Sequence, residues 1–121
     1  DVNAVNDFQI DYRCETFYEE DIAYEFKLNI FRIVQEQMNN IIKYSKANDV
    51  SFVLARNDTH ILLTIADNGV GFDTQLPRKG IGLHNIASRT DVYNGTLEID
   101  SAPGNGCSMK IRFPYQQSPA V

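Results

Sequence analysis

Residues 28–47 read LNIFRIVQEQMNNIIKYSKA, and the periodicity of this stretch decides the fold. Within a predicted helix from Ala23 to Ser45, apolar residues recur every three to four positions and should pack on a sheet: Ile30, Ile33, Val34, Met38 and Ile41. The opposite face carries polar residues that we expect to face a cleft: Asn29, Arg32, Glu36, Asn40 and Lys43.

Strand patterns lie on both sides of this helix. Before it, Phe8–Cys14 alternates apolar and polar residues, which is typical of a half-buried strand. After it come four strands in two pairs: Asp49–Asn57 with His60–Asp67, and Gly95–Ser101 with Cys107–Pro114. A second helix is predicted between the pairs over Gly82–Asn94, with these residues turned inward: Leu83, Ile86, Ala87 and Val92. This order predicts an α/β (α+β) two-layer sandwich with helices on one face of a mixed sheet.

Length and charge restrict the function classes. The chain has 121 residues, enough for one domain with a single core, which we place at residues 1–115 with a frayed tail at 116–121. The net charge of −5 argues against a nucleic-acid partner. No apolar stretch is long enough to span a membrane, so we expect no direct membrane contact by this domain.

The cysteines and the first residue bear on where the domain works. Cys14 and Cys107 fit no metal spacing, and a pair of cysteines indicates little about the redox compartment, so free thiols and a cytoplasmic location are the default expectation. Because the chain starts at Asp1 without an initiator Met, we expect it to be part of a longer protein, and that parent could be anchored in a membrane.

The polar face of the long helix is the first candidate site. Glu36, Asn40 and Lys43 are spaced so that they form one continuous line, and Tyr44 adjoins it. Mg²⁺ takes oxygen ligands and keeps several waters, so Asn40 and Glu36 could hold it together with phosphate oxygens, which Lys43 would neutralise. The alternative interpretation is a solvated helix face with ordinary charge pairs.

Two glycine-containing segments follow. Asp67-Asn68-Gly69-Val70-Gly71 ends a predicted strand, where a buried carboxylate could accept a hydrogen bond from an adenine amino group; a hairpin turn is the alternative. Gly80-Ile81-Gly82-Leu83 opens a helix, whose free amides suit phosphate. The chain has no Gly-x-x-x-x-Gly-Lys-Ser/Thr, so this is not a P-loop.

In order and spacing, these segments together resemble the catalytic ATP-binding domain of bacterial sensor histidine kinases, within the Bergerat-fold (GHKL) ATPase superfamily. The resemblance is greatest to the nitrate-sensor type of kinase and covers roughly Leu28 to Pro114. Residues 32–36, 39–40 and 43–47 are similar to the N-box of that family. Asp67–Phe72, Gly80–Leu83 and Gly104–Gly106 match its three glycine boxes.

The resemblance implies a role for each matching residue. Asn40 would ligate Mg²⁺ with Glu36 in or beside its shell, and Lys43 and Tyr44 would contact phosphate or sugar. Asp67 would bind the adenine amino group, with Gly69 and Gly71 lining the base. The remaining ATP contacts would come from a lid at residues 72–79, from its hinge and from the third glycine box: Phe72, Lys79, Gly80, Ile81, Gly82, Leu83 and Cys107. The implied fold has about three helices on one face of a mixed, mostly antiparallel sheet.

Two features depart from the family pattern. Cys107 stands where Thr or Ser is usual after the third glycine box, so the water near the adenine-binding Asp67 would be held less firmly, unless Ser108 substitutes for the missing hydroxyl. The lid is also short. His60 is expected at the surface and His84 on the surface of a helix, and neither lies in a phosphate-acceptor motif.

The resemblance implies an ATP-dependent protein histidine kinase whose acceptor histidine lies on a separate dimerisation domain, with a response regulator as the next partner. Glu36 could either assist the metal or activate water. Two alternatives remain open. One is an anti-sigma-type serine kinase, which shares the site but phosphorylates a partner protein. The other is a non-catalytic module that only binds ATP.

Overall fold

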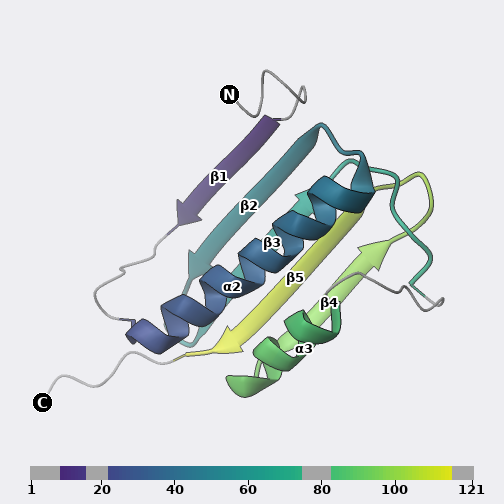
Figure 1. Cartoon of the computed structure of the whole chain (residues 1–121). Coiled ribbons are helices and arrows are strands. Elements are labelled where there is room, and N and C mark those ends of the chain that lie inside the picture. The colour runs from purple at the N-terminus through teal and green to yellow at the C-terminus, as the bar shows by residue number, and fades with distance from the viewer. Residues whose placement is uncertain (1–8, 16–21, 75–82, 116–121) are drawn as a thin grey trace, which may run out of the picture.

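A computed structural model of the chain describes residues 9–15, 22–74 and 83–115. These residues form five strands and two α-helices, the first of which continues into a π-helical turn (Figure 1). The elements are, in order, β1 (Gln9–Glu15), α2 (Tyr24–Asn40), η2 (Ile41–Ser45), β2 (Asp49–Arg56), β3 (His60–Asp67), α3 (Leu83–Val92), β4 (Thr96–Ser101) and β5 (Cys107–Pro114).

The strands form one mixed sheet in the order β1-β2-β3-β5-β4. β1 pairs with β2 in parallel, and the other three pairings are antiparallel, which confirms the predicted mixed, mostly antiparallel sheet. The pairing of β3 with β5 sets Asp67 opposite Cys107. This register brings two residues that are far apart in sequence to the same end of the sheet.

The helices α2 and α3 cover one face of the sheet, as Figure 1 shows, so the two-layer arrangement is confirmed. The described residues contain two α-helices where about three were expected for the whole domain. Alternate residues of the central strands are buried beneath α2 because side chains of a strand point in turn to opposite faces. The buried apolar residues of these strands are Val50, Phe52, Leu54, Ile61, Leu63, Ile65, Met109, Ile111 and Phe113.

The apolar face of α2 packs as its period predicts. Ile30, Ile33 and Ile41 are buried, and Val34 and Met38 pack partly buried against the same core. In α3 Ile86 is fully buried, which confirms its inward position, and Leu83 packs against the core. The inward position predicted for Val92 is wrong, because this last residue of the helix is 69 % exposed.

Tyr115, just after β5, holds the start of α2. The N-cap residue Ala23 has no side chain that could cap the helix, and its backbone N–H donates instead to the Tyr115 hydroxyl at 3.1 Å. The Tyr115 ring lies 4.9 Å from the Phe26 ring, and the Arg56 guanidinium lies over it at 5.3 Å. The start of the helix is thereby fixed by a residue from the other end of the described chain.

Candidate nucleotide-binding site

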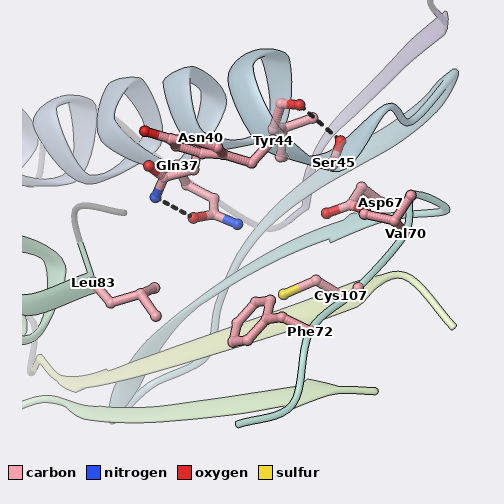
Figure 2. A pocket seen from close by; sticks show the side chains of 11 residues that line it. Gln37, Asn40, Tyr44, Ser45, Asp67, Val70, Phe72, Leu83 and Cys107 are labelled. Atoms are coloured by element: carbon pink, nitrogen blue, oxygen red, sulfur yellow. Dashed lines mark hydrogen bonds between the residues drawn. The ribbon is translucent and has the colours of Figure 1, made fainter. Parts of the chain in front are cut away.

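A pocket lies between the C-terminal part of α2 and the ends of β3 and β5, and Figure 2 shows its walls. The empty space in it is about 380 Å³, part of which is open to solvent. The lining residues are Gln37, Asn40, Ile41, Tyr44, Ser45, Asp67, Val70, Gly71, Phe72, Leu83 and Cys107. Three segments that were proposed from sequence as parts of one site therefore meet here.

Asp67, the last residue of β3, supplies the carboxylate of the pocket. Its Oδ1 accepts a hydrogen bond from the Gly69 N–H at 2.8 Å, which fixes the side chain. Burial raises the pKa of Asp67 above its usual value, and the Gly69 hydrogen bond partly offsets this. A carboxylate held this way can accept a hydrogen bond from a ligand amino group.

Asn68 secures the chain just after Asp67. Its Oδ1 accepts from the backbone N–H groups of Asn48 and Asp49, at 3.1 and 3.0 Å, and its Nδ2 donates to Asn48 Oδ1 at 2.7 Å. The Asn-Gly pair therefore ties β3 to the start of β2, and it is not the turn of a two-residue hairpin.

The glycines of the first and third boxes allow close backbone contacts. A Cβ on Gly69 would collide with the Ser45 backbone oxygen, and Val70 N–H donates to that same oxygen at 2.7 Å. Gly71 and Gly106 have φ of 65° and 69°, and a Cβ on either would collide with backbone of Ala102 or Asp67. The end of η2, the Asp67 segment and the turn before β5 are therefore interlocked through backbone atoms.

The Ser101 hydroxyl joins these segments beneath the pocket. It accepts from the Phe72 N–H at 3.0 Å and donates to the Gly106 carbonyl at 2.7 Å. It also interacts with the buried Cys107 thiol, whose pKa is raised to about 11 by burial and by the nearby charge of Asp67. The predicted substitute, Ser108, pairs opposite Ala66 and Asp100 and faces the other side of the sheet, so the hydroxyl beside Cys107 belongs to Ser101.

The helix side of the pocket carries amide side chains. Asn40 is buried, and its Nδ2 donates to Gln37 Oε1 at 3.2 Å, so the two amides orient each other (Figure 2). Tyr44 lines the pocket and is 37 % exposed. Lys43 is exposed on η2 and is not among the lining residues. π-helical turns occur frequently at functional sites.

Glu36 lies one turn before Asn40 and outside the pocket lining. Its Oε1 accepts a hydrogen bond from Asn85 Nδ2 of α3 at 2.9 Å. It lines a shallow hollow between α2 and α3 instead, together with Arg32 and Arg89. The polar face predicted for α2 therefore does not face one cleft as a whole. Asn29 and Asn40 are buried, whereas Arg32 and Lys43 are exposed.

Several sequence predictions can be compared with the pocket directly. Asn40, Tyr44, Asp67, Gly71, Phe72, Leu83 and Cys107 line it, and Gly69 lies directly behind it. Lys79, Gly80, Ile81 and Gly82 lie outside the described residues. Sequence reasoning missed Gln37, Ile41, Ser45 and Val70. The position of Gln37, one turn before Asn40 on the same face, was the available signal for the first of them.

The pocket was also compared with the needs of a metal ion, which binds side-chain oxygen atoms. Within the described ranges no group of three or more His, Cys, Asp or Glu residues could hold a metal ion. An amide and a carboxylate one helical turn apart, Asn40 and Glu36, suit a hard cation that takes its remaining ligands from water and phosphate. Both residues carry oxygen ligands of the kind that Mg²⁺ takes, and they do not form a closed metal site.

Comparison with known families identifies the family of the domain that contains this pocket. Residues 27–117 match the sequence profile of the histidine kinase-, DNA gyrase B- and HSP90-like ATPases. The chain belongs to this family. The resemblance to the catalytic ATP-binding domain of sensor histidine kinases is confirmed, whereas the narrower likeness to the nitrate-sensor type stays a prediction.

Within the ATPase family, similar sequences include named histidine kinases. The chain is 32% identical over 97 residues to the signal transduction histidine-protein kinase/phosphatase DegS of Bacillus subtilis, covering 77% of this chain and 25% of that one. It is 33% identical over 92 residues to the oxygen sensor histidine kinase NreB of Staphylococcus carnosus, covering 74% and 26%. The chain thus spans about a quarter of the length of these relatives.

Solved structures agree on the fold of this ATPase domain. The blue-light activated histidine kinase EL346 of Erythrobacter litoralis superposes with a TM-score of 0.73 at 16% identity, covering 97% of this chain and 39% of that one. The mycobacterial sensor histidine kinase MprB gives 0.68 at 19% identity, covering 97% and 89%. At these identities the likeness shows the fold alone. Among the described helices, none is long and apolar enough to cross a membrane.

Proposed function

We propose that this ATPase domain binds Mg-ATP and transfers the γ-phosphoryl group to a histidine on a separate dimerisation domain. The observation that carries this proposal is the position of Asp67. Its carboxylate is partly buried, fixed by the Gly69 N–H, and shares one pocket with Asn40 and Tyr44. A base-recognising acceptor and polar side chains that suit phosphate thus line a single site.

Asp67 would recognise the adenine amino group. Its desolvated carboxylate is a strong acceptor, and the neighbouring Gly71 has no side chain that would obstruct the ring. The side chains of Phe72 and Leu83 add apolar surface to the lining of the pocket, as Figure 2 shows. These contacts would hold a purine base.

The C-terminal part of α2 would handle the phosphates. Asn40 and Glu36 would hold Mg²⁺, which neutralises phosphate charge when bound. Lys43, exposed on η2, would neutralise phosphate charge, and the adjacent Tyr44 lines the pocket. Phosphoryl transfer depends mostly on positioning and charge neutralisation, which is what these residues provide.

The partners follow from the reaction. The domain would receive its acceptor histidine from a dimerisation domain of the same protein and would pass the phosphoryl group to a response regulator in the cytoplasm. DegS, LiaS and NreB, which share about a third of their aligned residues with this chain, are all named histidine kinases. Lys79, Gly80, Ile81 and Gly82 would complete the site as the lid and the second glycine box.

Nucleotide binding is tested with Asp67→Ala. Loss of a hydrogen bond to a charged group costs about 1.5–3 kcal/mol, so we expect ATP affinity to fall roughly ten- to hundredfold. Isothermal calorimetry with Mg-ATP measures this, with Asp100→Ala as an exposed carboxylate control that should bind as the wild type does. Equal affinity of the Asp67 variant and the wild type would refute the assignment.

Phosphoryl transfer is tested by adding γ-labelled ATP and a histidine-bearing helical acceptor domain to the chain. We expect acid-labile, base-stable label on the acceptor, because phosphohistidine has that stability. Label on a serine of an added protein would favour the anti-sigma-type kinase. Tight ATP binding without any transfer would favour a non-catalytic module.

A further inference from the structure

Asn85 of α3 is a hydrogen-bond partner of Glu36 from another element. Its Nδ2 donates to Glu36 Oε1 at 2.9 Å across 49 residues of sequence. Both roles open to Glu36, metal ligand or base, require that its carboxylate present an oxygen in a fixed direction. We infer that Asn85 is a positioning residue that holds the Glu36 carboxylate for the reaction, which rests on the proposed function above.

The helix that carries Asn85 is firmly placed. Ile86, the next residue, is fully buried, and so is Thr90, whose hydroxyl donates to the Ile86 carbonyl at 2.8 Å. At the other end of α3, Asn29 of α2 donates from Nδ2 to the Arg89 carbonyl at 2.8 Å. The Asn29 hydrogen bond and the burial of Ile86 in the core therefore hold α3 against α2, so Asn85 is supported by a packed helix.

The chemistry of the contact suits positioning. A neutral amide fixes one carboxylate oxygen, Oε1, without adding a positive charge beside Glu36. Lys or Arg at this position would form an ion pair with Glu36 and compete with a metal ion or a proton for the same carboxylate. Asn85 thus restrains the geometry of Glu36 while keeping its charge.

The location of Asn85 also connects two sides of the site. It lies two residues after Leu83, which lines the pocket, and within the first turn of α3. Glu36 lies one turn from Asn40, which lines the opposite wall. A shift of α3 would therefore change the direction of Glu36 and the wall at Leu83 together.

Asn85→Ala is the first test, in the transfer assay with γ-labelled ATP and the helical acceptor domain. We expect kcat to fall about tenfold, with a clearly smaller loss of affinity for Mg-ATP by calorimetry. Asn85→Asp keeps the shape but places a second carboxylate against Glu36, so it should lower kcat further. Ser88→Ala, an exposed polar residue one turn further along α3, is the matched control and should retain wild-type kcat.

A double-mutant cycle separates positioning from a general structural effect. Glu36→Asp shortens the side chain by one methylene, which removes the contact but keeps a carboxylate. In that background Asn85→Ala should have no further effect on kcat, because the two residues act through one interaction. If the two losses multiply, or if Asn85→Ala weakens nucleotide binding as much as turnover, the inference is wrong.

A measurement without turnover completes the test. The side-chain amide resonances of Asn85 should shift in Glu36→Gln and stay in place in Ser88→Ala. An unshifted Asn85 amide, or wild-type kcat in both Asn85 variants, would overturn the positioning role while the kinase assignment stands. A wild-type chain that binds no ATP and transfers no phosphoryl group would instead overturn the proposed function.

Discussion

The two sides of the pocket are built differently. On the strand side, Gly69, Gly71 and Gly106 interlock through backbone atoms, and Asp67 is fixed by a backbone N–H. On the helix side, Lys43 and Tyr44 are exposed on η2, and Glu36 accepts a hydrogen bond from the Asn85 side chain. Under the proposed function, the purine would meet a surface fixed by backbone contacts, whereas the phosphates would meet side chains. We therefore predict that stability and recognition depend mainly on the strand side and turnover on the helix side.

The largest expected effect is on the strand side. Gly71→Ala adds a Cβ at φ 65° that collides with the Ala102 carbonyl and lies 2.7 Å from the Gly106 oxygen. Strain and overpacking together should lower the free energy of unfolding by about 3 kcal/mol, measured by urea denaturation. Gly104→Ala is the control, because its φ is 84° but its Cβ would meet open space; it should lose only about 1 kcal/mol. Equal losses in the two variants would mean that the close backbone contacts of Gly71 add nothing to the free energy of unfolding.

Asp67→Asn should change stability and binding in opposite directions. Burial raises the pKa of Asp67 in the folded state above 3.8, so folding favours the protonated form and the ionised form costs stability. The variant should therefore unfold at a higher temperature than the wild type near neutral pH, and this gain should shrink as the pH falls through the raised pKa toward 3.8. Its ATP affinity should fall. A variant less stable than the wild type at neutral pH would contradict this account.

Cys107 gives a smaller, alkaline effect. Burial raises the pKa of its thiol from 9.0 to about 11, so the thiol is neutral in both states below pH 9. As the pH rises from 9.0 to about 11, the unfolded state loses its proton first, and the wild type should lose stability relative to Cys107→Ser. With solvent screening, the difference should be on the order of 1 kcal/mol. Denaturation curves at several alkaline pH values measure it, and a constant difference would show that the thiol is not desolvated.

The smallest effect on stability is expected on the helix side. Lys43→Ala removes an exposed side chain, so the free energy of unfolding should change by less than about 0.5 kcal/mol. ATP affinity should nevertheless fall a few-fold at low salt and approach the wild-type value at high salt, since exposed charges are screened. Lys110→Ala, exposed on the uncovered face of the sheet, is the control and should leave affinity unchanged at both salt concentrations. A large loss of stability in Lys43→Ala would erase the distinction between the two sides.

Local sequence patterns predicted the elements well. The period of α2 and the alternation in the strands placed each described boundary within a few residues, because burial on one face determines both patterns. The order of the strands could not be read in the same way. The parallel pairing of β1 with β2 and the insertion of β5 between β3 and β4 depend on contacts between distant segments.

The site was predicted in part for a related reason. Asp67 and Asn40 follow from spacing and resemblance, and the pocket brings them together. Ser101 and Asn85 were missed, since a lone Ser in a strand and a lone Asn on a helix have no local signature. Ser108 was considered because it adjoins Cys107, yet adjacent strand residues point to opposite faces. Only the register of β4 and β5 shows that Ser101 has the required position.

The contact between Tyr115 and the first turn of α2 has a practical consequence for anyone who shortens or fuses this domain. The helix that carries Glu36 and Asn40 has its first backbone N–H capped by a hydroxyl from beyond the final strand. A truncation after Pro114 would keep all residues of the described strands. It would nevertheless remove the Tyr115 hydroxyl that accepts from the Ala23 N–H, and it would uncover one side of the Phe26 ring. A fusion partner is best joined downstream of Tyr115, with the tyrosine retained.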